Sequence, residues 1–306
     1  MTEFERRTLE SPTGAHLALY ERPAPGTPKA VIHINHGLAE HAARYRPFAN
    51  YLSGRGFHVC AHDHRGHGLT TAPDGAPRRY ADKDGWNKVM TDVAAVEADL
   101  RARFPGVPLF VFGHSMGGVI AFNQALHQSE SLAGVAVWNS NLFGPAGLLK
   151  FLLGLESVIG GRFKPSGIVD QMTFKAWDKT FAKERPAFGW LSRDLAVVDA
   201  YVADPLCGWP AQISLWQDFA DGMAFGADAG NLQPVRKDLP IHLVGGSKDP
   251  ATEGGKAMKR LARHLKKAGF ADISIDVLKN FRHETLNEIG AEAEMIKFAD
   301  WVEARL

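Results

Sequence analysis

Residues 109–118 read LFVFGHSMGG and hold the most informative pattern in the sequence. The first four residues are apolar and predict a buried strand, while residues 119–122 (VIAF) begin a helical pattern. Between them, Gly113-x-Ser115-x-Gly117 predicts a sharp strand-to-helix turn that pushes the serine hydroxyl out of the sheet, with glycines where side chains would collide. The pentapeptide alone is common by chance. Its place between a strand and a helix predicts a nucleophilic serine.

Strand-like and helical patterns alternate on both sides of this turn. That alternation predicts an α/β fold with a mostly parallel sheet and helices on both faces. In such a sheet a ligand binds at the carboxyl ends of the strands, which is where Ser115 lies. The expected strands are 30–35, 58–63, 109–112, 134–139, 241–245 and 273–278, and the expected helices cover 47–55, 87–104, the segment after Ser115, 254–267 and the chain from about 289.

The alternation stops between residues 140 and 237, a stretch with several tryptophans and few strand signals. We expect a core domain formed by 1–139 and 238–306, and a helical cap formed by 140–237 above Ser115. The cap opens with an expected helix over 142–159, with Lys150 on one side and a row of leucines on the other. Two interpretations stay open: the helix packs into the cap interior, or it forms an apolar mouth that admits a lipid chain and touches a membrane surface.

Composition excludes several classes of protein. The 306 residues are 45% hydrophobic and carry 35 basic against 34 acidic side chains, so no net charge favours nucleic acid or an anionic membrane. We find no secretion signal in the first fifteen residues and no apolar run of eighteen residues. Cys60 and Cys207 are far apart, a usage that predicts reduced thiols and a cytoplasmic location.

A serine nucleophile needs a general base, usually histidine, and a carboxylate to orient that base. In a strand-turn-helix setting the expected chain order is serine, acid, histidine. Beyond the cap, His283 lies in a loop after the last expected strand, whereas His242 lies in a strand and His264 in a basic helix. Asp249 follows the 241–245 strand. It is a better candidate for the acid than three other aspartates. Asp238 precedes a strand, Asp272 flanks one, and Asp276 lies within one.

The oxyanion of an acyl-transfer intermediate needs two hydrogen-bond donors. The backbone N–H of Met116 begins the helix after Ser115 and is expected to supply one. The loop after the 30–35 strand is expected to supply the other, from the N–H of Leu38. Because both donors are backbone groups, these side chains can vary almost freely.

Histidines are concentrated between residues 33 and 67, which suggests a metal site as an alternative. His62, His64 and His67 have the spacing of an HxHxDH motif, but Gly66 stands where the motif needs aspartate. We therefore expect no metal and no organic cofactor. His67 is expected in a tight turn, with Asp63 as a structural hydrogen-bond acceptor.

Six motifs recur in an order that resembles the α/β-hydrolase subfamily of monoacylglycerol lipases and lysophospholipases, also grouped as serine aminopeptidase-like hydrolases. The resemblance implies an α/β-hydrolase fold with a helical cap. It also implies Ser115 as nucleophile, Asp249 as acid, His283 as base, and Leu38 and Met116 as oxyanion donors. The motifs are HGLAEHAARY (36–45), AHDHRGHG (61–68), GHSMGG (113–118), LSRDLAVVDAYVADPL (191–206), GGSKDP (245–250) and RHETLNE (282–288).

Two positions depart from the family pattern. Ala39 replaces a usual glycine in the 36–41 motif, and Thr70 replaces a usual serine. The resemblance also places Glu40 and Arg44 near the polar end of the substrate. A purely structural salt bridge between them is an equally good interpretation.

We expect a serine esterase that cleaves single-chain acyl esters, such as monoacylglycerols or lysophospholipids, through an acyl-enzyme on Ser115. The expected partner is a small lipid or ester, with transient membrane contact through the cap and none with nucleic acid. One alternative is an aminopeptidase or amidase with the same three residues. Another is a binding protein without turnover. Epoxide hydrolases and dehalogenases share the implied fold but need a carboxylate nucleophile, which Ser115 replaces.

Overall fold

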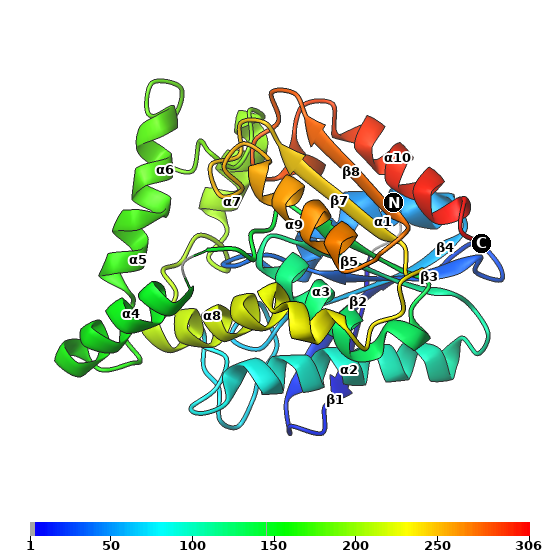
Figure 1. Cartoon of the computed structure of the whole chain (residues 1–306), viewed down its shortest axis with the longest axis horizontal. Helices are drawn as coiled ribbons and strands as arrows, with labels where there is room; N and C mark the ends of the chain where they lie inside the picture. The colour runs from blue at the N-terminus through cyan, green and yellow to red at the C-terminus, as the bar shows by residue number, and fades with distance from the viewer. Residues whose placement is uncertain (1–3, 145) are drawn as a thin grey trace.

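The computed structural model describes residues 4–144 and 146–306 and is built around one eight-stranded sheet (Figure 1). The strand order is β1-β2-β4-β3-β5-β6-β7-β8, and every pair from β4 to β8 is parallel. The expected α/β class is therefore confirmed. The strands are β1 (Glu5–Glu10), β2 (His16–Arg22), β3 (Ala30–Asn35), β4 (Phe57–His62), β5 (Leu109–His114), β6 (Gly134–Trp138), β7 (Ile241–Gly246) and β8 (Ile273–Leu278).

Helices cover both faces of the sheet. Buried side chains of α1 and α10 share one hydrophobic cluster with one face, and those of α2, α3 and α9 share a second cluster with the other. The helices are α1 (Arg46–Gly54), α2 (Gly85–Arg103), α3 (Met116–Gln128), α4 (Ala146–Gly160), α5 (Gly167–Met172), α6 (Phe174–Phe181), α7 (Leu195–Ala203), α8 (Ile213–Ala227), α9 (Lys256–Lys267) and α10 (Ala291–Glu303).

The first two strands were not expected from the sequence. Strand β1 lies at the sheet edge, where it pairs only with β2, and most of its side chains face solvent. Because most of its residues are charged, the sequence contains no apolar run there that would predict a strand. Strand β2 runs antiparallel to both β1 and β4, so this hairpin is the antiparallel end of the sheet.

Helices α4 to α8 lie between β6 and β7, in the stretch for which the cap is predicted. In Figure 1, α4, α5 and α6 project to the left, away from the sheet. Helix α8 contacts α4 but also packs against α2 and α3, so it joins the projecting helices to the sheet layer. Helix α4 begins at Ala146, later than expected, and Pro145 lies outside the described residues.

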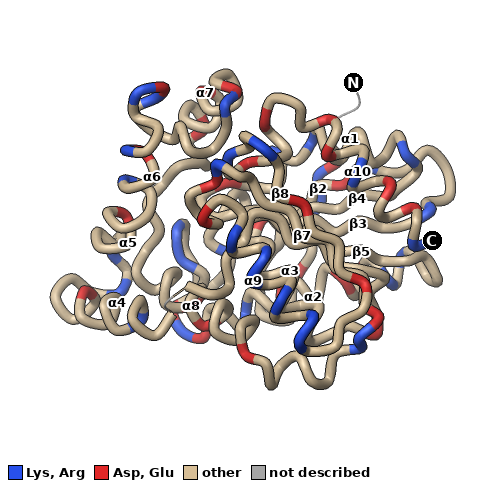
Figure 2. The backbone as a smooth tube through the Cα atoms, turned by 45° about the horizontal axis from the view of Figure 1, so that its top comes forward, with Lys and Arg blue, Asp and Glu red and all other residues tan. Residues whose placement is uncertain are grey.

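Basic (Lys, Arg) and acidic residues are both spread over the helices and loops, whereas the central strands β3 to β7 carry none (Figure 2). Among the described residues, no helix combines the length and apolarity needed to cross a membrane. The carboxyl ends of the parallel neighbours β3, β5, β6 and β7 lie at the same edge of the sheet, and the loops that leave these ends carry the candidate site.

Candidate active site

The turn at Ser115 is as tight as its glycines indicate. Ser115 has φ 55° and ψ −118°, outside the regions that most residues adopt. A Cβ added at Gly113 would lie 2.0 Å from the carbonyl oxygen of Gly117, and one added at Gly117 would lie 2.1 Å from that of Asn35. Both glycines are therefore required by backbone contacts. The Ser115 N–H donates to the Trp138 carbonyl (2.8 Å), which ties the turn to β6.

Three predicted residues converge at this turn. His283 Nε2 lies 2.9 Å from Ser115 Oγ, and His283 Nδ1 lies 3.0 Å from Asp249 Oδ1. These distances suit two consecutive hydrogen bonds, from the serine hydroxyl to the imidazole and from the imidazole to the carboxylate. The side chains come from loops after β5, β7 and β8, which the sequence separates by up to 168 residues.

Asp249 is fully buried and held by further donors. Thr252 Oγ1 (2.8 Å) and Asn139 Nδ2 (3.0 Å) donate to Oδ2, and the Ala251 N–H (2.9 Å) donates to Oδ1. Burial alone would raise the pKa of this carboxyl. Attraction to His283 and the hydrogen bonds from His283, Asn139 and Thr252 outweigh burial, so the pKa of Asp249 is lowered and the carboxylate stays charged.

Asn139 and Thr252 were not among the predicted site residues. Asn139 directly follows β6, and its side-chain oxygen accepts a hydrogen bond from Thr285 Oγ1 (2.9 Å) in the His283 loop. A polar residue at the carboxyl end of a central strand was the available signal for Asn139. Thr252 lies one turn beyond Asp249, a spacing that is common in loops and indicates little alone.

The two expected oxyanion donors come from two different parts of the chain. Met116 is the first residue of α3, where a helix leaves its N–H without an intrahelical partner. Leu38 lies in the loop after β3, and both residues line the same cavity as Ser115. Their roles as donors stay a prediction.

Glu40 and Arg44 form the expected salt bridge. Arg44 Nη1 lies 2.5 Å from Glu40 Oε2, and the guanidinium also binds Glu284 through two bonds of 2.7 Å. Glu40 Oε1 accepts from the Gly37 N–H at 2.6 Å and so holds the loop that carries Leu38. Burial opposes ionisation of Glu40, but Arg44 and His114 outweigh it and hold the pKa of this carboxyl well below its usual range.

His114 joins this salt bridge to the histidine of the site. One ring nitrogen lies 3.5 Å from Glu40 Oε1 and the other lies 2.9 Å from the backbone oxygen of His283. Burial lowers the pKa of His114, but the bond and attraction to Glu40 raise it more, so the net direction is upward. His114 and Glu284 were not singled out from the sequence.

His242, His264 and His67 lie where the sequence indicated. His242 is within β7 and accepts from Trp138 Nε1 (3.1 Å), and His264 is within α9. His67 is buried in the turn after β4, and burial lowers its pKa to about 3. Asp63 accepts from the N–H groups of Ala42 and Leu69 (both 2.8 Å), which confirms its interpretation as a structural acceptor.

A cavity of about 500 Å³ opens above Ser115, within the range of small-molecule sites. Its floor is polar and includes Ser115, His283 and Asn139. The remainder is mostly apolar and comes from α4 to α8. The apolar lining includes Leu148, Leu149, Leu152, Val169, Met172, Phe174, Trp177, Trp190, Trp216, Phe219 and Met223.

Comparison with known proteins gives the family. The family described as serine aminopeptidase, S33, matches residues 26–290. The chain belongs to this family. It is 37% identical to human monoglyceride lipase over 118 residues (39% of the chain, 37% of that protein) and 31% identical to a monkeypox virus monoglyceride lipase homolog over 182 residues (58% and 57%). These matches span less than two thirds of those two relatives.

A longer match is to the monoacylglycerol lipase of Mycolicibacterium smegmatis, with 26% identity over 298 residues (94% of the chain, 93% of that protein). Among solved structures, a lipase in its open form has TM-score 0.86 and 27% identity over 99% of each chain. A carboxyl esterase from Bacillus coagulans has TM-score 0.88 at 22% identity, again over 99% of each chain, and supports the fold alone. The resemblance drawn from the six motifs, and with it the α/β-hydrolase fold, is confirmed.

Proposed function

We propose that the protein is a serine hydrolase that cleaves carboxylic esters of single acyl chains. The observation that carries the proposal is the hydrogen-bonded series from Ser115 through His283 to buried Asp249, on the floor of an apolar cavity. An activated serine at the floor of an apolar cavity suits a substrate with one reactive ester and one hydrocarbon chain. The activity of the lipase relatives agrees with this assignment.

In the proposed mechanism, His283 takes the proton of Ser115 as the hydroxyl attacks the ester carbonyl. The N–H groups of Leu38 and Met116 hold the resulting oxyanion, and His283 then protonates the departing alcohol. Water attacks the acyl-enzyme with His283 again as base, and the fatty acid leaves. Asp249 holds the imidazole in the tautomer that accepts at Nε2 and stabilises its protonated form.

The apolar lining supports a single acyl chain, with the alcohol directed at the polar floor. Glycerol or a phosphoryl alcohol would lie near Glu40, which the family resemblance places at the polar end. Monoacylglycerols and lysophospholipids both meet these conditions, and no cofactor enters the steps above. In this proposal Glu40 and Arg44 are candidate substrate contacts, and each is already engaged in a salt bridge.

An aminopeptidase or amidase with the same three residues is the second candidate, and the family description favours it. Such an enzyme needs carboxylates free to bind an amino terminus. Among the described acidic residues that line the cavity, most are already paired, which argues against this candidate. Glu40 and Glu284 bind Arg44, Asp170 binds Lys175, and Asp178 accepts from the Phe188 N–H.

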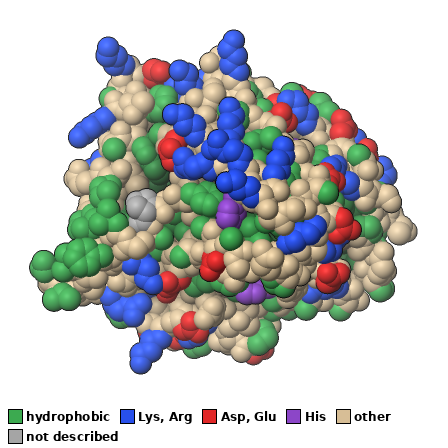
Figure 3. Space-filling view, viewed as in Figure 1, with side chains coloured by type: hydrophobic (Ala, Val, Ile, Leu, Met, Phe, Trp, Pro, Cys, Tyr) green, Lys and Arg blue, Asp and Glu red, His purple; other side chains and the backbone are tan. Residues whose placement is uncertain are grey.

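The end of the predicted cap supports transient contact with a membrane surface. Helix α4 leaves large apolar side chains in solvent: Phe151 is 62% exposed, Val158 85% and Ile159 90%. Apolar atoms gather at this end of the molecule in Figure 3. A contiguous exposed apolar patch is typical of an interaction site. We place the enzyme in the cytoplasm, with α4 as the part of the cap (140–237) that touches lipid.

A panel of substrates tests the proposal. Purified protein is given monoacylglycerols, lysophosphatidylcholines, p-nitrophenyl esters of graded length and aminoacyl-arylamides. We expect ester cleavage, with kcat/KM rising as the acyl chain lengthens to fill the cavity, and arylamide cleavage that is lower by orders of magnitude. Faster arylamide than ester cleavage would favour the aminopeptidase, and ligand retention without product would favour a binding protein.

A further inference from the structure

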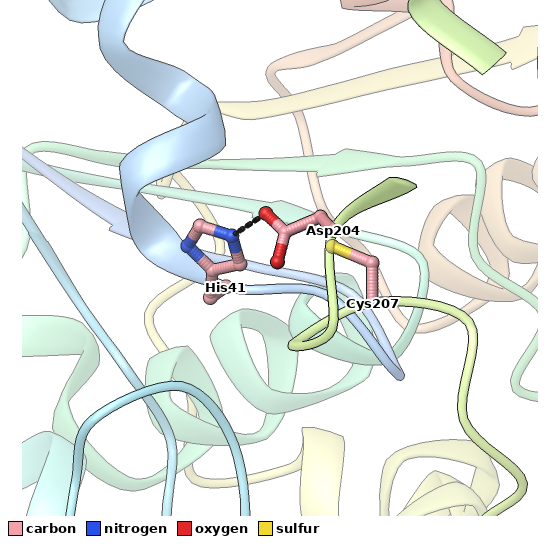
Figure 4. A group of neighbouring side chains, drawn as sticks. All are labelled: His41, Asp204 and Cys207. Atoms are coloured by element: carbon pink, nitrogen blue, oxygen red, sulfur yellow. Dashed lines mark hydrogen bonds and ion pairs between the residues drawn. The ribbon is translucent and has the colours of Figure 1, made fainter. Parts of the chain in front are cut away.

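A second cluster of reactive side chains lies beside the cavity and takes no part in the proposed hydrolysis. It consists of His41, which follows the loop carrying Leu38, and of Asp204 and Cys207 between α7 and α8 (Figure 4). One potential ligand atom from each lies within 4.8 Å of the other two. Within residues 4–144 and 146–306, no other three histidine, cysteine or acidic side chains meet in this way, and His62, His64 and His67 do not.

The three donors are already oriented toward one another. His41 Nε2 lies 2.8 Å from Asp204 Oδ2, the bond drawn in Figure 4. Asp204 is fixed in turn, because its Oδ1 accepts from the Leu206 N–H (2.8 Å) and its backbone oxygen accepts from the Cys207 N–H (3.0 Å). His41 and Cys207 are buried, while Asp204 is half-buried and gives solvent a route to the cluster.

The charged groups around the cluster are of both signs. The largest charge effect on the Cys207 thiol comes from the Arg44 guanidinium, and the carboxylates of Glu40, Asp204 and Glu284 follow. Because Arg44 is already paired with Glu40 and Glu284, Asp204 is the carboxylate available to a cation. Burial, the largest effect, raises the pKa of Cys207, so the free thiol keeps its proton at neutral pH.

We propose that His41, Asp204 and Cys207 form a binding site for a thiophilic divalent cation such as Zn²⁺, with water as the fourth ligand. Imidazole nitrogen, carboxylate oxygen and thiolate sulfur together are a donor set that zinc accepts in tetrahedral geometry. On binding, a metal–sulfur bond replaces the S–H bond and the proton passes to solvent. His41 coordinates through Nε2 and carries its ring proton on Nδ1.

Binding would link two walls of the cavity. The Gly208 N–H and the Tyr201 hydroxyl both donate to the Ala39 carbonyl at 2.9 Å, so the 201–208 segment already rests on the loop that carries Leu38. A metal bridge from His41 to Cys207 would fasten this contact. The cation therefore acts on the cap segment and the oxyanion loop, not on the ester, and loading raises the melting temperature.

Cobalt titration tests the site directly, since Co²⁺ bound to a thiolate gives a near-ultraviolet charge-transfer band. With reduced, chelator-treated protein we expect one equivalent of Co²⁺ to produce this band and Zn²⁺ to abolish it by displacement. Cys207→Ser should remove the band. Cys60→Ser, the matched control in β4, should retain it. His41→Gln and Asp204→Asn should each weaken binding by at least about 100-fold, because loss of even an outer-shell partner costs on the order of 10- to 100-fold.

Absence of the band in the wild-type protein, or a band that survives Cys207→Ser, would overturn the proposal. A melting temperature that Zn²⁺ raises equally in wild type and Cys207→Ser would also count against it. Neither outcome touches the proposed esterase, whose activity is assayed separately with metal chelated.

Discussion

The floor and the roof of the cavity are built in opposite ways. On the floor, polar atoms are fixed by several partners each: Asp249 accepts four hydrogen bonds, and Glu40 is held by Arg44, Tyr45 and Gly37. The roof consists of helices α4 to α8 with apolar linings, and α4 leaves Phe151 and Ile159 in solvent.

This contrast separates chemistry from substrate choice. The floor is set by strand ends that the sheet holds in register, so its geometry tolerates little change. The roof depends on apolar contacts, which tolerate exchange of one side chain for another of similar size. We therefore expect floor substitutions to lower turnover by large factors and roof substitutions to change which substrates are reached.

Removing the nucleophile is the strongest test of the floor. Ser115→Ala should lower kcat/KM for a p-nitrophenyl ester by about 10⁶-fold, because no other group would replace the attacking oxygen. The melting temperature should stay close to that of the wild type, since Ser115 lies at a cavity surface. Residual activity within tenfold of the wild type would mean that the ester is attacked elsewhere.

Asp249→Asn should lower kcat by roughly 10⁴-fold, because an amide would hold His283 in the wrong tautomer. Thr252→Ala is the graded control. It removes one of four hydrogen bonds to the same carboxylate and should cost about 1.5 to 3 kcal/mol, or about 10- to 100-fold in rate. Equal losses in the two variants would show that Asp249 acts only by packing.

Asp218, on the α8 helix that joins roof to floor, should make stability depend on pH. Burial is the main cause that raises its pKa from 3.8 to about 7, and its Oδ2 has no hydrogen-bond partner among the described residues. Between about pH 4 and pH 7 the Asp218 carboxyl is therefore protonated in the folded state but ionised in the unfolded chain. Stability should fall as pH rises from 4 to 7 and then level off.

Asp218→Asn should remove that dependence. The variant should match the wild type near pH 4 and be more stable at pH 8, by on the order of 3 kcal/mol in the free energy of unfolding from urea titrations. A stability difference that is the same at both pH values would contradict the assignment.

Polar substitution of the roof should affect lipid access and not turnover. We expect Phe151→Ser with Ile159→Ser to lower hydrolysis of monoacylglycerol in vesicles by about tenfold, because each lost apolar contact weakens surface binding. Hydrolysis of a soluble short-chain ester should stay the same. Ile289→Ser with Ile296→Ser, exposed before and within α10, is the control and should leave both rates unchanged. If both substrates were hydrolysed more slowly by the same factor, the two side chains of α4 would be needed for folding and not for contact with lipid.

The smallest effect is expected at Ala39, where the family pattern has glycine. Ala39 has φ 55°, a left-handed conformation that costs an alanine about 1 kcal/mol more than a glycine. Ala39→Gly should therefore gain up to about 1 kcal/mol in the free energy of unfolding. Ala43→Gly, in a right-handed turn, should lose a similar amount. A loss in both variants would mean that the Cβ of Ala39 contributes more by packing than its backbone costs.

The sequence predicted the parallel strands well, because they are continuous apolar runs, but it missed the buried antiparallel strand β2. Strands β3 and β8 have the expected bounds, and Ser115, Asp249 and His283 followed from chain order and strand ends. Strand β1 could not be predicted, since its pairing with β2 satisfies the backbone and leaves charged side chains in solvent.

Contacts between distant loops could not be predicted from the sequence either. The bond between Asn139 and Asp249 and the pairing of Arg44 with Glu284 join residues more than 100 positions apart, and no local pattern encodes them. The same holds for His41 and Asp204, which the quoted motifs contain separately. The division into core (1–139 and 238–306) and cap (140–237) stays a prediction, and α8 contacts both sides of it.

The central claim is that Ser115 is the nucleophile activated by His283. The most direct measurement is mass spectrometry of the intact and digested protein after treatment with a fluorophosphonate. The account predicts one adduct per chain on the peptide that contains Ser115, with labelling abolished in Ser115→Ala and strongly slowed in His283→Ala. Equal labelling of Ser115→Ala, or an adduct on another residue, would contradict it.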